Sequence, residues 1–538
     1  MRLLLLVAAA AVIYGIGLDH TPPYLHRDEV EISLQAHAIA TTGRDLDGRL
    51  LPLYFRMKHL GPRVWFHPMI VYVTAASQQV LPIGEAWFRL PTVFVGLLNI
   101  VLMYFVARRL FSGTPEGVPD VSGTTKRGGY EFGDRWALVA AALLAMTPAH
   151  FMHSRLAFDF IYPLPFVLSW LLGLQIFLQR RQPWILFVTT TVLGIGFYSY
   201  IASIIMMPIY LAVTIGLLIA TRTASVRACA YAVAGFAWPL LLLVPWIISQ
   251  PHFIGDIFNR YGEAAQTLQA TSTARLNFAA IAERVTLYWS FLDPSFLFLS
   301  GGYTRMTNST RLVGVFLAPL IVLVPLGVFH VLTVRRSPMS VLVLLGFFLA
   351  PVAPTLSVLE PYASDRELAV LVFGVLLATF GVERILTWRE RWPRPAALLL
   401  LAFLPLHFLF FQVHYFGDYH RRSASWYEWN HPAALEAIID RENGPAVRPV
   451  YLSSGVEKNI EAFWMLATAK RGRRDLLAHT VYFDSKTLDL ATVPPGSLMF
   501  VTVDDRALLA AAAAGQLREV MQAEEPADAP VFYVLEKP

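Results

Sequence analysis

Long apolar runs separated by short polar segments make up most of the first 415 residues. Eleven of these runs approach the length of about 20 residues that a helix needs to cross a bilayer. The predicted crossings are residues 3–18, 91–107, 136–150, 161–179, 184–200, 201–221, 229–249, 312–331, 339–356, 367–383 and 395–414. The pattern therefore predicts an all-α polytopic membrane domain over residues 1–415.

Basic residues gather at alternate connections between these segments. Lys and Arg accumulate in cytoplasmic loops, so these connections are expected on the inner side of the membrane. The five clusters are Arg108/Arg109 with Lys126, Arg127 and Arg135; Arg180/Arg181; Arg222/Arg227; Arg335/Arg336; and Arg384, Arg389, Arg391 and Arg394. Because the first segment starts inside and the number of crossings is odd, the C-terminal tail is predicted to lie outside.

Two apolar stretches depart from this simple pattern. Residues 3–18 are expected to be a retained helix, because no small-x-small cleavage site precedes the polar residues that begin at Asp19. Residues 64–82 are predicted to form a helix that lies along the outer surface or dips partway into the bilayer, because a full crossing there would move Arg108 and Arg109 to the outer side. The alternative is an ordinary span compensated by a missed crossing elsewhere.

The composition agrees with a membrane protein and argues against other classes. Hydrophobic residues make up 56% of the chain and charged residues only 15%. The net charge of +5 comes mostly from the inner loops, and no basic stretch is interleaved with aromatic residues, so nucleic acid is not an expected partner. Cys229 is the single cysteine, so the outer regions must fold without an internal disulfide.

The first outer segment carries the first candidate catalytic residues. Asp28 followed by Glu31 resembles a capping box and Gly43 is a typical helix stop, so residues 29–42 are predicted to form a short surface helix that Asp28 begins. Asp28 and Glu29 also lie close to the lipid boundary, where ionisable groups are costly and often functional. The alternative is that Asp28 serves only as the helix cap.

A second carboxylate is expected at the same depth. The short outer turn after the third crossing contains His150, His153, Arg155 and Asp159, and so short a turn keeps them near the membrane surface. Asp159 is therefore a candidate partner of Asp28; the alternative is a helix-capping aspartate paired with Arg155. The two histidines are either metal ligands or interfacial side chains.

Two further outer segments carry candidate substrate contacts. The long loop 250–311 contains an aromatic block, LDPSFLFLSGG, followed by Tyr303 and Arg305. Aromatic side chains there suit either the lipid interface or stacking on a sugar ring. Arg366 precedes the tenth crossing, and its planar fork suits a phosphate; the alternative is an interfacial Arg that extends to water.

The order of these motifs resembles the GT-C glycosyltransferases of the protein O-mannosyltransferase and aminoarabinose-transferase type. The tracts are DE after the first crossing, TGRDLDGRLLPLYF, SR with a nearby Asp after the third crossing, DPSFLFLSGG, and an Arg before a late crossing, all within residues 1–420. The resemblance implies a transmembrane helical core with surface helices in the first outer loop. It also implies an inverting transfer of a sugar from a polyprenyl-phosphate donor to a lipid, glycan or protein acceptor outside a bacterial cytoplasmic membrane.

The resemblance assigns roles to the candidate residues. Asp28 is the expected base with Glu29 as its rival, Asp159 orients the acceptor or the donor, and Arg366 contacts the phosphate. Further substrate contacts are expected from Lys58, Arg63, Arg155, Tyr303 and Arg305. No cofactor is required, and a divalent metal is compatible with the resemblance because some relatives bind one.

Residues 416–538 differ in pattern and are predicted to form a small extracytoplasmic α/β domain. Strands are expected at VYLSS, TVYF, LMFVTV and VFYVLEK, and helices at IEAFWMLATAK and RALLAAAAAGQLREVM. The segment contains no Gly-rich phosphate loop and no nucleophile motif, so acceptor binding or packing over the site is its expected role.

Two functions besides glycosyl transfer from a lipid phosphate remain as alternatives. One is a transporter or flippase for a lipid-linked saccharide, and the other is a glycan polymerase or ligase. Transporters usually place ionisable groups near the bilayer midplane, whereas the predicted crossings have charged residues only at their ends. The sequence therefore favours an enzyme that works at the outer surface.

Overall fold

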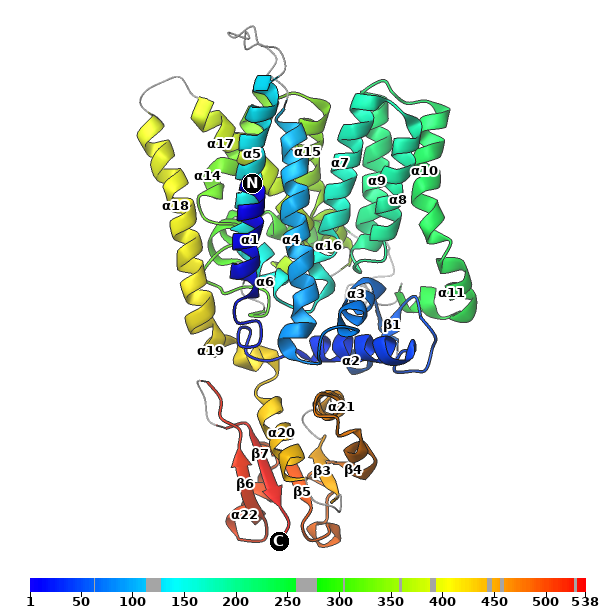
Figure 1. Ribbon diagram of the computed structural model, residues 1–538, viewed down its shortest axis with the longest axis vertical. Coiled ribbons are helices and arrows are strands. Elements are labelled where there is room, and N and C mark those ends of the chain that lie inside the picture. The colour runs from blue at the N-terminus through cyan, green and yellow to red at the C-terminus, as the bar shows by residue number, and fades with distance from the viewer. Residues whose placement is uncertain are drawn as a thin grey trace.

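The computed structural model describes residues 1–61, 63–112, 127–257, 278–302, 305–357, 360–387, 393–442, 448–454, 459–526 and 530–538. Upright helices form one bundle, and a smaller α/β unit is attached to one end of it (Figure 1). Within the described residues, the bundle contains every segment that the hydrophobic pattern predicted to cross the membrane.

Seven spans in the described residues are long and apolar enough to cross a membrane. Their helices are α4 (Glu85–Leu110), α7 (Leu164–Arg180), α9 (Ser203–Ala220), α10 (Val226–Leu240) with α11 (Leu243–Ser249), α15 (Pro338–Leu349) with α16 (Val352–Ser357), α17 (Ala369–Thr387) and α18 (Pro393–His414). An eighth is the pair α5 (Arg127–Ala145) and α6 (Pro148–Ser154), which is bent by 63°. Three shorter apolar helices are α1 (Arg2–Gly15), α8 (Pro183–Gly196) and α14 (Leu320–Thr333), so each of the eleven predicted segments is helical.

The predicted inner connections gather at one end of the bundle. Arg109 Nη1 donates a hydrogen bond to Gln179 Oε1 at 2.6 Å, and Arg335 and Arg336 line the same cavity as these two residues. The α9–α10 connection, the C-terminal end of α17 and the N-terminal end of α18 lie at this end as well, opposite the α/β unit (Figure 1). The arrangement agrees with the prediction that the basic connections lie on one side of the membrane and the candidate site residues on the other.

The first outer segment forms surface helices at the opposite end. Helix α2 (Arg27–Thr42) lies across the end of the bundle, and α3 (Pro68–Gln78) packs beside it (Figure 1). A short hairpin of β1 (Phe55–Arg56) and β2 (Trp65–Phe66) separates them. With 11 residues, α3 is too short to cross a bilayer, which agrees with the prediction that residues 64–82 do not form a full crossing.

The start of α2 differs from the prediction. His26 is the N-cap, because its Nδ1 accepts a hydrogen bond from the Asp28 backbone N–H at 3.1 Å and the Glu29 carboxylate accepts one from the His26 backbone N–H at 3.0 Å. The prediction that Asp28 begins and caps this helix is therefore wrong. Asp28 lies in the first turn instead, and Gly43 ends the helix at φ +69° as predicted.

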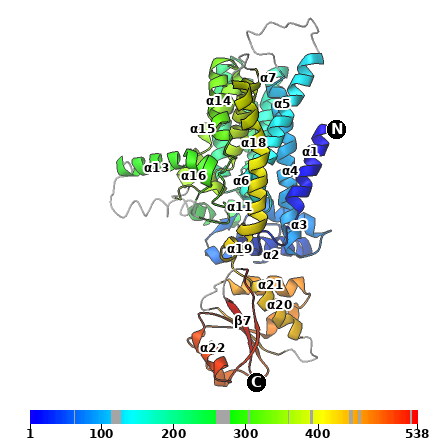
Figure 2. The ribbon, with the colours of Figure 1, turned by 90° about the vertical axis from the view of Figure 1, so that its left-hand side faces the viewer.

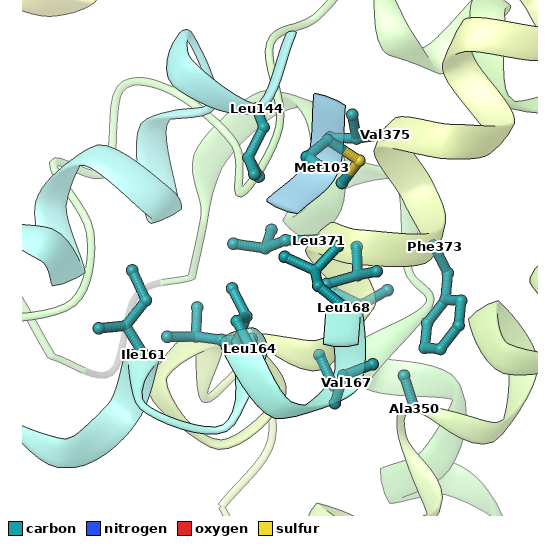
Figure 3. Packing of buried hydrophobic residues seen from close by; sticks show 14 of the residues in the cluster. Met103, Leu144, Ile161, Leu164, Val167, Leu168, Ala350, Leu371, Phe373 and Val375 are labelled. Atoms are coloured by element: carbon teal, nitrogen blue, oxygen red, sulfur yellow. The ribbon is translucent and has the colours of Figure 1, made fainter. Parts of the chain in front are cut away.

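The core of the bundle surrounds α17, almost all of whose side chains are buried. Helices α14 and α17 pack at close range, because a Cβ on Gly327 would lie 1.8 Å from a backbone oxygen of α17 and one on Gly381 would lie 2.0 Å from a backbone oxygen of α14. Leu371 of α17 packs among side chains that include Leu168 of α7 and Met103 of α4 (Figure 3). This packing gives the outer end a rigid support.

One helix of the long outer segment was not predicted. Within the long segment 250–311, α13 (Phe278–Phe291) runs sideways out of the bundle (Figure 2). Arg284 Nη1 donates a hydrogen bond to the Thr355 carbonyl, which ties α13 to α16. This long segment therefore leaves the bundle before it returns to α14.

The C-terminal unit contains a five-stranded mixed sheet in the order β4-β3-β5-β7-β6. Its strands are β3 (Val450–Ser453), β4 (Thr480–Phe483), β5 (Leu498–Thr502), β6 (Arg518–Gln522) and β7 (Phe532–Glu536), and its helices are α20 (His431–Arg441), α21 (Ile460–Lys470) and α22 (Arg506–Ala513). Strand β3 is parallel to β4 and β5, whereas β7 is antiparallel to β5 and β6. The α/β prediction is confirmed, with strands where the four apolar motifs predicted them.

Strand β6 corrects the sequence-based assignment of one long helix over RALLAAAAAGQLREVM. Helix α22 ends at Ala513, Gly515 adopts φ +76°, and Arg518–Gln522 pairs with β7. A glycine in the left-handed region commonly ends a helix. Pairing with β7 then overrides the helical propensity of the residues that follow.

Candidate functional site

A cavity of about 350 Å³ lies at the end of the bundle that carries α2. Its wall includes Asp28 of α2, His59 of the first outer segment, Asp159, Arg305 and Arg366. Four of the nine predicted site residues therefore meet here, although they are up to 338 positions apart in the sequence. Two carboxylates and two guanidinium groups in one cavity can handle a proton and a phosphate together.

Asp28 is held as an ionised carboxylate. His59 Nε2 lies 2.7 Å from Asp28 Oδ1, and His26 Nδ1 lies 3.6 Å from the same oxygen. Burial alone would raise the pKa of Asp28, but the charges of His26, His59 and Arg27 and the hydrogen bond from His59 together lower it to about 2. Asp28 therefore carries a negative charge at any physiological pH.

His59 connects Asp28 to Glu31 and was not recognised from the sequence. Its side chain is 3% exposed, its Nδ1 lies 3.2 Å from Glu31 Oε1, and its backbone N–H donates to the same oxygen at 2.9 Å. Burial lowers the pKa of His59, but the two carboxylates outweigh it and raise the pKa to about 9. The spacing of Asp28 and Glu31 was an available signal, since residues three apart share one face of a helix.

Arg366 forms the opposite wall of the cavity. Its Nη1 donates a hydrogen bond to Tyr200 Oη at 2.8 Å, and its Nε lies 3.2 Å from Asp365 Oδ2. Burial would lower the pKa of Arg366, but Tyr200 and Asp365 outweigh it and raise the pKa above its ordinary value. Arg366 thus stays charged in a buried position, with its orientation set by two neighbours.

Asp159 and Arg305, together with Arg27, add further charged groups to the lining. Asp159 begins a single 3₁₀ turn, Asp159–Ile161, and is 4% exposed. Arg305 is half-exposed and forms an ion pair with Glu360 at 3.0 Å between its Nε and Glu360 Oε1. The cavity therefore has a buried charged interior and a more accessible cation at its edge.

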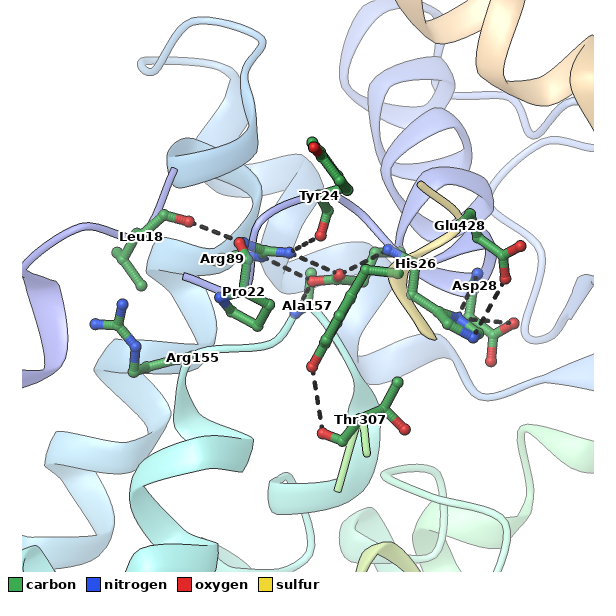
Figure 4. Close-up of polar contacts among 12 residues, drawn as sticks. Leu18, Pro22, Tyr24, His26, Asp28, Arg89, Arg155, Ala157, Thr307 and Glu428 are labelled. Carbon is green, nitrogen blue, oxygen red and sulfur yellow. Dashed lines mark hydrogen bonds and ion pairs between the residues drawn. The ribbon is translucent and has the colours of Figure 1, made fainter. Parts of the chain in front are cut away.

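Glu29 occupies a separate buried cluster next to this cavity (Figure 4). Arg89 binds both of its oxygens, with Nε–Oε1 and Nη2–Oε2 distances of 3.0 Å, and the Ala157 backbone N–H donates to Oε1 at 2.8 Å. Arg89 also donates hydrogen bonds to carbonyl oxygens in the segment that links α1 to α2, those of Leu18, Pro22 and Tyr24. The cluster fixes the N-terminus of α2, and with it Asp28.

Three predicted substrate contacts lie away from the cavity, and a fourth cannot be placed. Arg155 is fully buried and donates hydrogen bonds to the carbonyl oxygens of Tyr14, Gly17 and Thr21 at the end of α1. Lys58 and Arg63 are exposed and do not line the cavity. Tyr303 lies outside the residues that the structure describes.

The histidines considered as metal ligands have other surroundings. His150 is fully buried, and its Nδ1 lies 2.9 Å from Tyr14 Oη. His153 is buried beside Phe160. Within the described ranges, no group of three or more His, Cys, Asp or Glu side chains is arranged to hold a metal ion.

The bundle, its surface helices and the C-terminal sheet define a GT-C-type membrane fold, which the order of the motifs predicted. The structure is similar to two of ArnT from Cupriavidus metallidurans: one bound to undecaprenyl phosphate, at 14% identity and a TM-score of 0.59, and one in the apo state, at 16% and 0.60. Each alignment covers 99% of this chain and 97% of that one. At these identities the likeness establishes the fold.

A more distant similarity is to the Archaeoglobus fulgidus oligosaccharyltransferase in a complex with Zn and sulfate. It covers 86% of this chain and 61% of that one, at 12% identity and a TM-score of 0.47. No protein-family model matches the chain. No curated protein matches it either.

Proposed function

We propose that the chain is an inverting membrane glycosyltransferase that moves a sugar from a polyprenyl-phosphate donor to an acceptor at the face that carries α2. The observation that carries the proposal is the presence of Asp28 and Arg366 in one cavity. The fold supports it, because the similar ArnT binds undecaprenyl phosphate. The basic clusters at the opposite end of the bundle favour an outer, periplasmic position for this face.

Arg366 and Arg305 bind the phosphate of the donor. A guanidinium offers two parallel N–H donors to phosphate oxygens, and the contacts of Arg366 with Tyr200 and Asp365 hold its fork in place before the donor arrives. When the bond between the anomeric carbon and the phosphate oxygen breaks, its electron pair leaves with the phosphate. The fixed positive charges stabilise the extra negative charge of the leaving group.

Asp28 takes the proton of the acceptor hydroxyl or amine as the acceptor atom bonds to the anomeric carbon. A carboxylate with a pKa of about 2 is always ionised but is a weak base. The donor phosphate adds negative charge to the same cavity, and a nearby like charge raises the pKa of a carboxyl group. Asp28 therefore becomes a stronger base when the donor is bound, and Asp159 orients the acceptor or the donor.

Glu29 does not act as the base in this scheme. Arg89 holds both of its oxygens, and two backbone N–H groups donate to them as well. An acceptor would have to displace a buried ion pair to reach them. The role of Glu29 is to hold α2 in place.

The proposal predicts that Asp28→Asn abolishes transfer and leaves the loaded donor on the protein. An amide has no useful basicity, so transfer should fall by about 10²–10⁴-fold. Helix α2 should persist because His26 is its cap. The measurement is mass spectrometry of the lipid that copurifies with each protein, which should show polyprenyl phosphate carrying a sugar in the variant and its sugar-free form in the wild type.

Asp418→Asn is the matched control, because Asp418 is an exposed carboxylate paired with Arg422 outside the cavity. It should behave like the wild type. Near-normal transfer by Asp28→Asn would move the base to Asp159. Absence of any prenyl phosphate from all three proteins would contradict the proposed donor.

A further inference from the structure

A second cavity of about 240 Å³ adjoins the first and shares six lining residues with it, which are His26, Arg27, Asp28, Phe158, Phe160 and Arg305. Its remaining wall is different, because Thr307, Asn308 and the segment that follows α18 replace Arg366 and Asp159. Figure 4 shows Thr307 and Glu428 on either side of the region that contains His26 and Asp28. Asp28 therefore lies at the boundary between a phosphate-binding cavity and a second space with its own lining.

The apolar part of this second lining is aromatic. Phe158 and Phe160 belong to the wall that the two cavities share, Trp426 lines the second cavity alone, and no aliphatic side chain among the described residues contributes. Trp426 is 37% exposed, and the Arg311 guanidinium lies 5.8 Å from its ring centroid. Acyl chains are usually bound by aliphatic side chains as well, whereas aromatic faces pack against the C–H groups of a sugar ring.

The polar part offers fixed hydrogen-bonding groups. Asn308 is 8% exposed, and its Oδ1 is buried without a hydrogen-bond partner among the described residues. Ser425 presents an exposed hydroxyl group. A buried acceptor without a partner is costly, so it marks a place where a ligand donor would be favourable.

Glu428 is held in one orientation beside these groups. Arg27 Nε donates to Glu428 Oε1 at 2.6 Å and Arg27 Nη2 donates to Oε2 at 2.8 Å. Glu428 and Trp429 both have φ values near +60°, which residues with a Cβ rarely adopt. Such backbone persists only where its surroundings hold it, and it is typical of ligand sites.

We propose that this second cavity is the acceptor subsite and that it binds a saccharide ring. The inference rests on the proposed function, and it selects a glycan from the possible acceptors. Trp426 packs against the ring, Asn308 Oδ1 and the Glu428 carboxylate accept hydrogen bonds from sugar hydroxyls, and one hydroxyl reaches Asp28. The acceptor oxygen then faces the donor sugar held from the Arg366 side.

The test is saturation-transfer-difference NMR on the purified full chain with three probes, chitotriose, mannotriose and maltotriose. At least one should show transfer from the protein, and Trp426→Ala and Asn308→Ala should each weaken that signal at least fivefold. Trp426→Phe should retain it, because an aromatic face remains. Trp238→Ala is the control, since Trp238 is an exposed indole on α10 that does not line the cavity.

Binding of undecaprenyl phosphate, measured on the same samples, separates this inference from the proposed function. Donor binding with no saccharide signal that depends on Trp426 would overturn the subsite alone. If the wild type does not bind undecaprenyl phosphate, the result counts against the proposed function. A Trp426-dependent signal from a Ser/Thr-rich peptide or a phospholipid vesicle, without one from any saccharide, would assign the cavity to that other acceptor and overturn the inference.

Discussion

The charge state of the cavity depends on three side chains that face one another. Asp28 and Glu31 lie one turn apart on α2, and His59 lies between their carboxylates. These three side chains alone carry a net negative charge, whereas Arg27, Arg305 and Arg366 add positive charge to the same cavity. His59 thus reduces the repulsion between Asp28 and a donor phosphate, and it keeps Asp28 ionised.

The first prediction at this scale concerns His59→Gln. His59→Gln removes one of the positive charges and the hydrogen bond that oppose the effect of burial, while the charges of His26 and Arg27 remain, so the pKa of Asp28 should rise by about 1–3 units from about 2. The acid limb of the pH profile of kcat/KM should move upward by the same amount. His20→Gln, at an exposed histidine, should leave the profile unchanged.

The contacts of His59 with Asp28 and Glu31 also predict how the stability of the protein depends on pH. The pKa of His59 is raised from 6.5 to about 9, so its stabilising contribution is complete below 6.5 and is lost as the pH rises through 9. The thermal unfolding temperature of the wild type should therefore fall over this window, and His59→Gln should lack that decrease. Parallel curves for the two proteins would show that His59 is not charged in the fold.

A second residue-scale prediction concerns Arg366→Ala. A charge-assisted hydrogen bond to phosphate contributes about 1.5–3 kcal/mol, so the Kd for undecaprenyl phosphate should increase roughly tenfold to a hundredfold. Arg63→Ala should leave the Kd unchanged, because Arg63 is exposed and does not line the cavity. Equal losses in both variants would indicate general attraction to the basic surface, and no loss in either would make Arg366 an interfacial residue.

At the scale of elements, the position of α2 depends on the buried Glu29–Arg89 pair. Arg89 belongs to α4, Glu29 to α2, and the carbonyl groups that Arg89 binds belong to the link between α1 and α2. One guanidinium therefore holds together three elements that are separate in sequence. Removal of the Glu29–Arg89 ion pair should therefore reduce the stability of the fold, and any effect on activity should follow from that.

Glu29→Gln should destabilise the fold by about 3–5 kcal/mol, because Arg89 would remain buried without its counter-charge. The measurement is the free energy of unfolding in detergent. Glu436→Gln is the matched control, since Glu436 pairs with Lys470 and Arg471 near the surface, where such pairs contribute about 0–1 kcal/mol. If Glu29→Gln were as stable as Glu436→Gln but inactive, Glu29 would become the candidate catalytic base.

At the scale of the whole molecule, the cavity that contains Asp28 and the basic clusters lie at opposite ends of the bundle. The C-terminal unit is attached at the end that carries α2 and the cavity, where Lys470 of α21 lies 3.0 Å from Glu85 of α4 and Arg27 binds Glu428. The unit therefore packs directly against the helices that form the site. The cavity and the C-terminal unit therefore share one end of the molecule.

Cysteine labelling tests this orientation in intact cells with a permeabilised outer membrane. Starting from Cys229→Ser, which removes the single cysteine, Ala514→Cys in the C-terminal unit should react with an impermeant thiol reagent and Ala224→Cys between α9 and α10 should not. Both positions are exposed in the fold, so access depends on the side of the membrane. The reverse pattern would invert the proposed topology.

The sequence by itself determined the features that depend on local composition. Apolar segment length predicted the helices of the bundle, because a bilayer requires a nearly constant number of residues. Alternating basic loops predicted which connections share an end. Together they showed that Asp28, Asp159 and Arg366 lie on one face, because each follows or precedes a crossing on the same side.

Only the tertiary structure decided how individual polar groups are used. Glu29 and Asp28 are adjacent in sequence, but one is held by Arg89 and the other faces a cavity, because burial and partners depend on distant segments. His59, Asn308 and Trp426 carry no local motif, because each lines its cavity beside segments that are not its neighbours in the sequence. Strand β6 likewise exists because β7 lies beside it. Local pattern determines which elements form, and long-range packing determines which side chains meet.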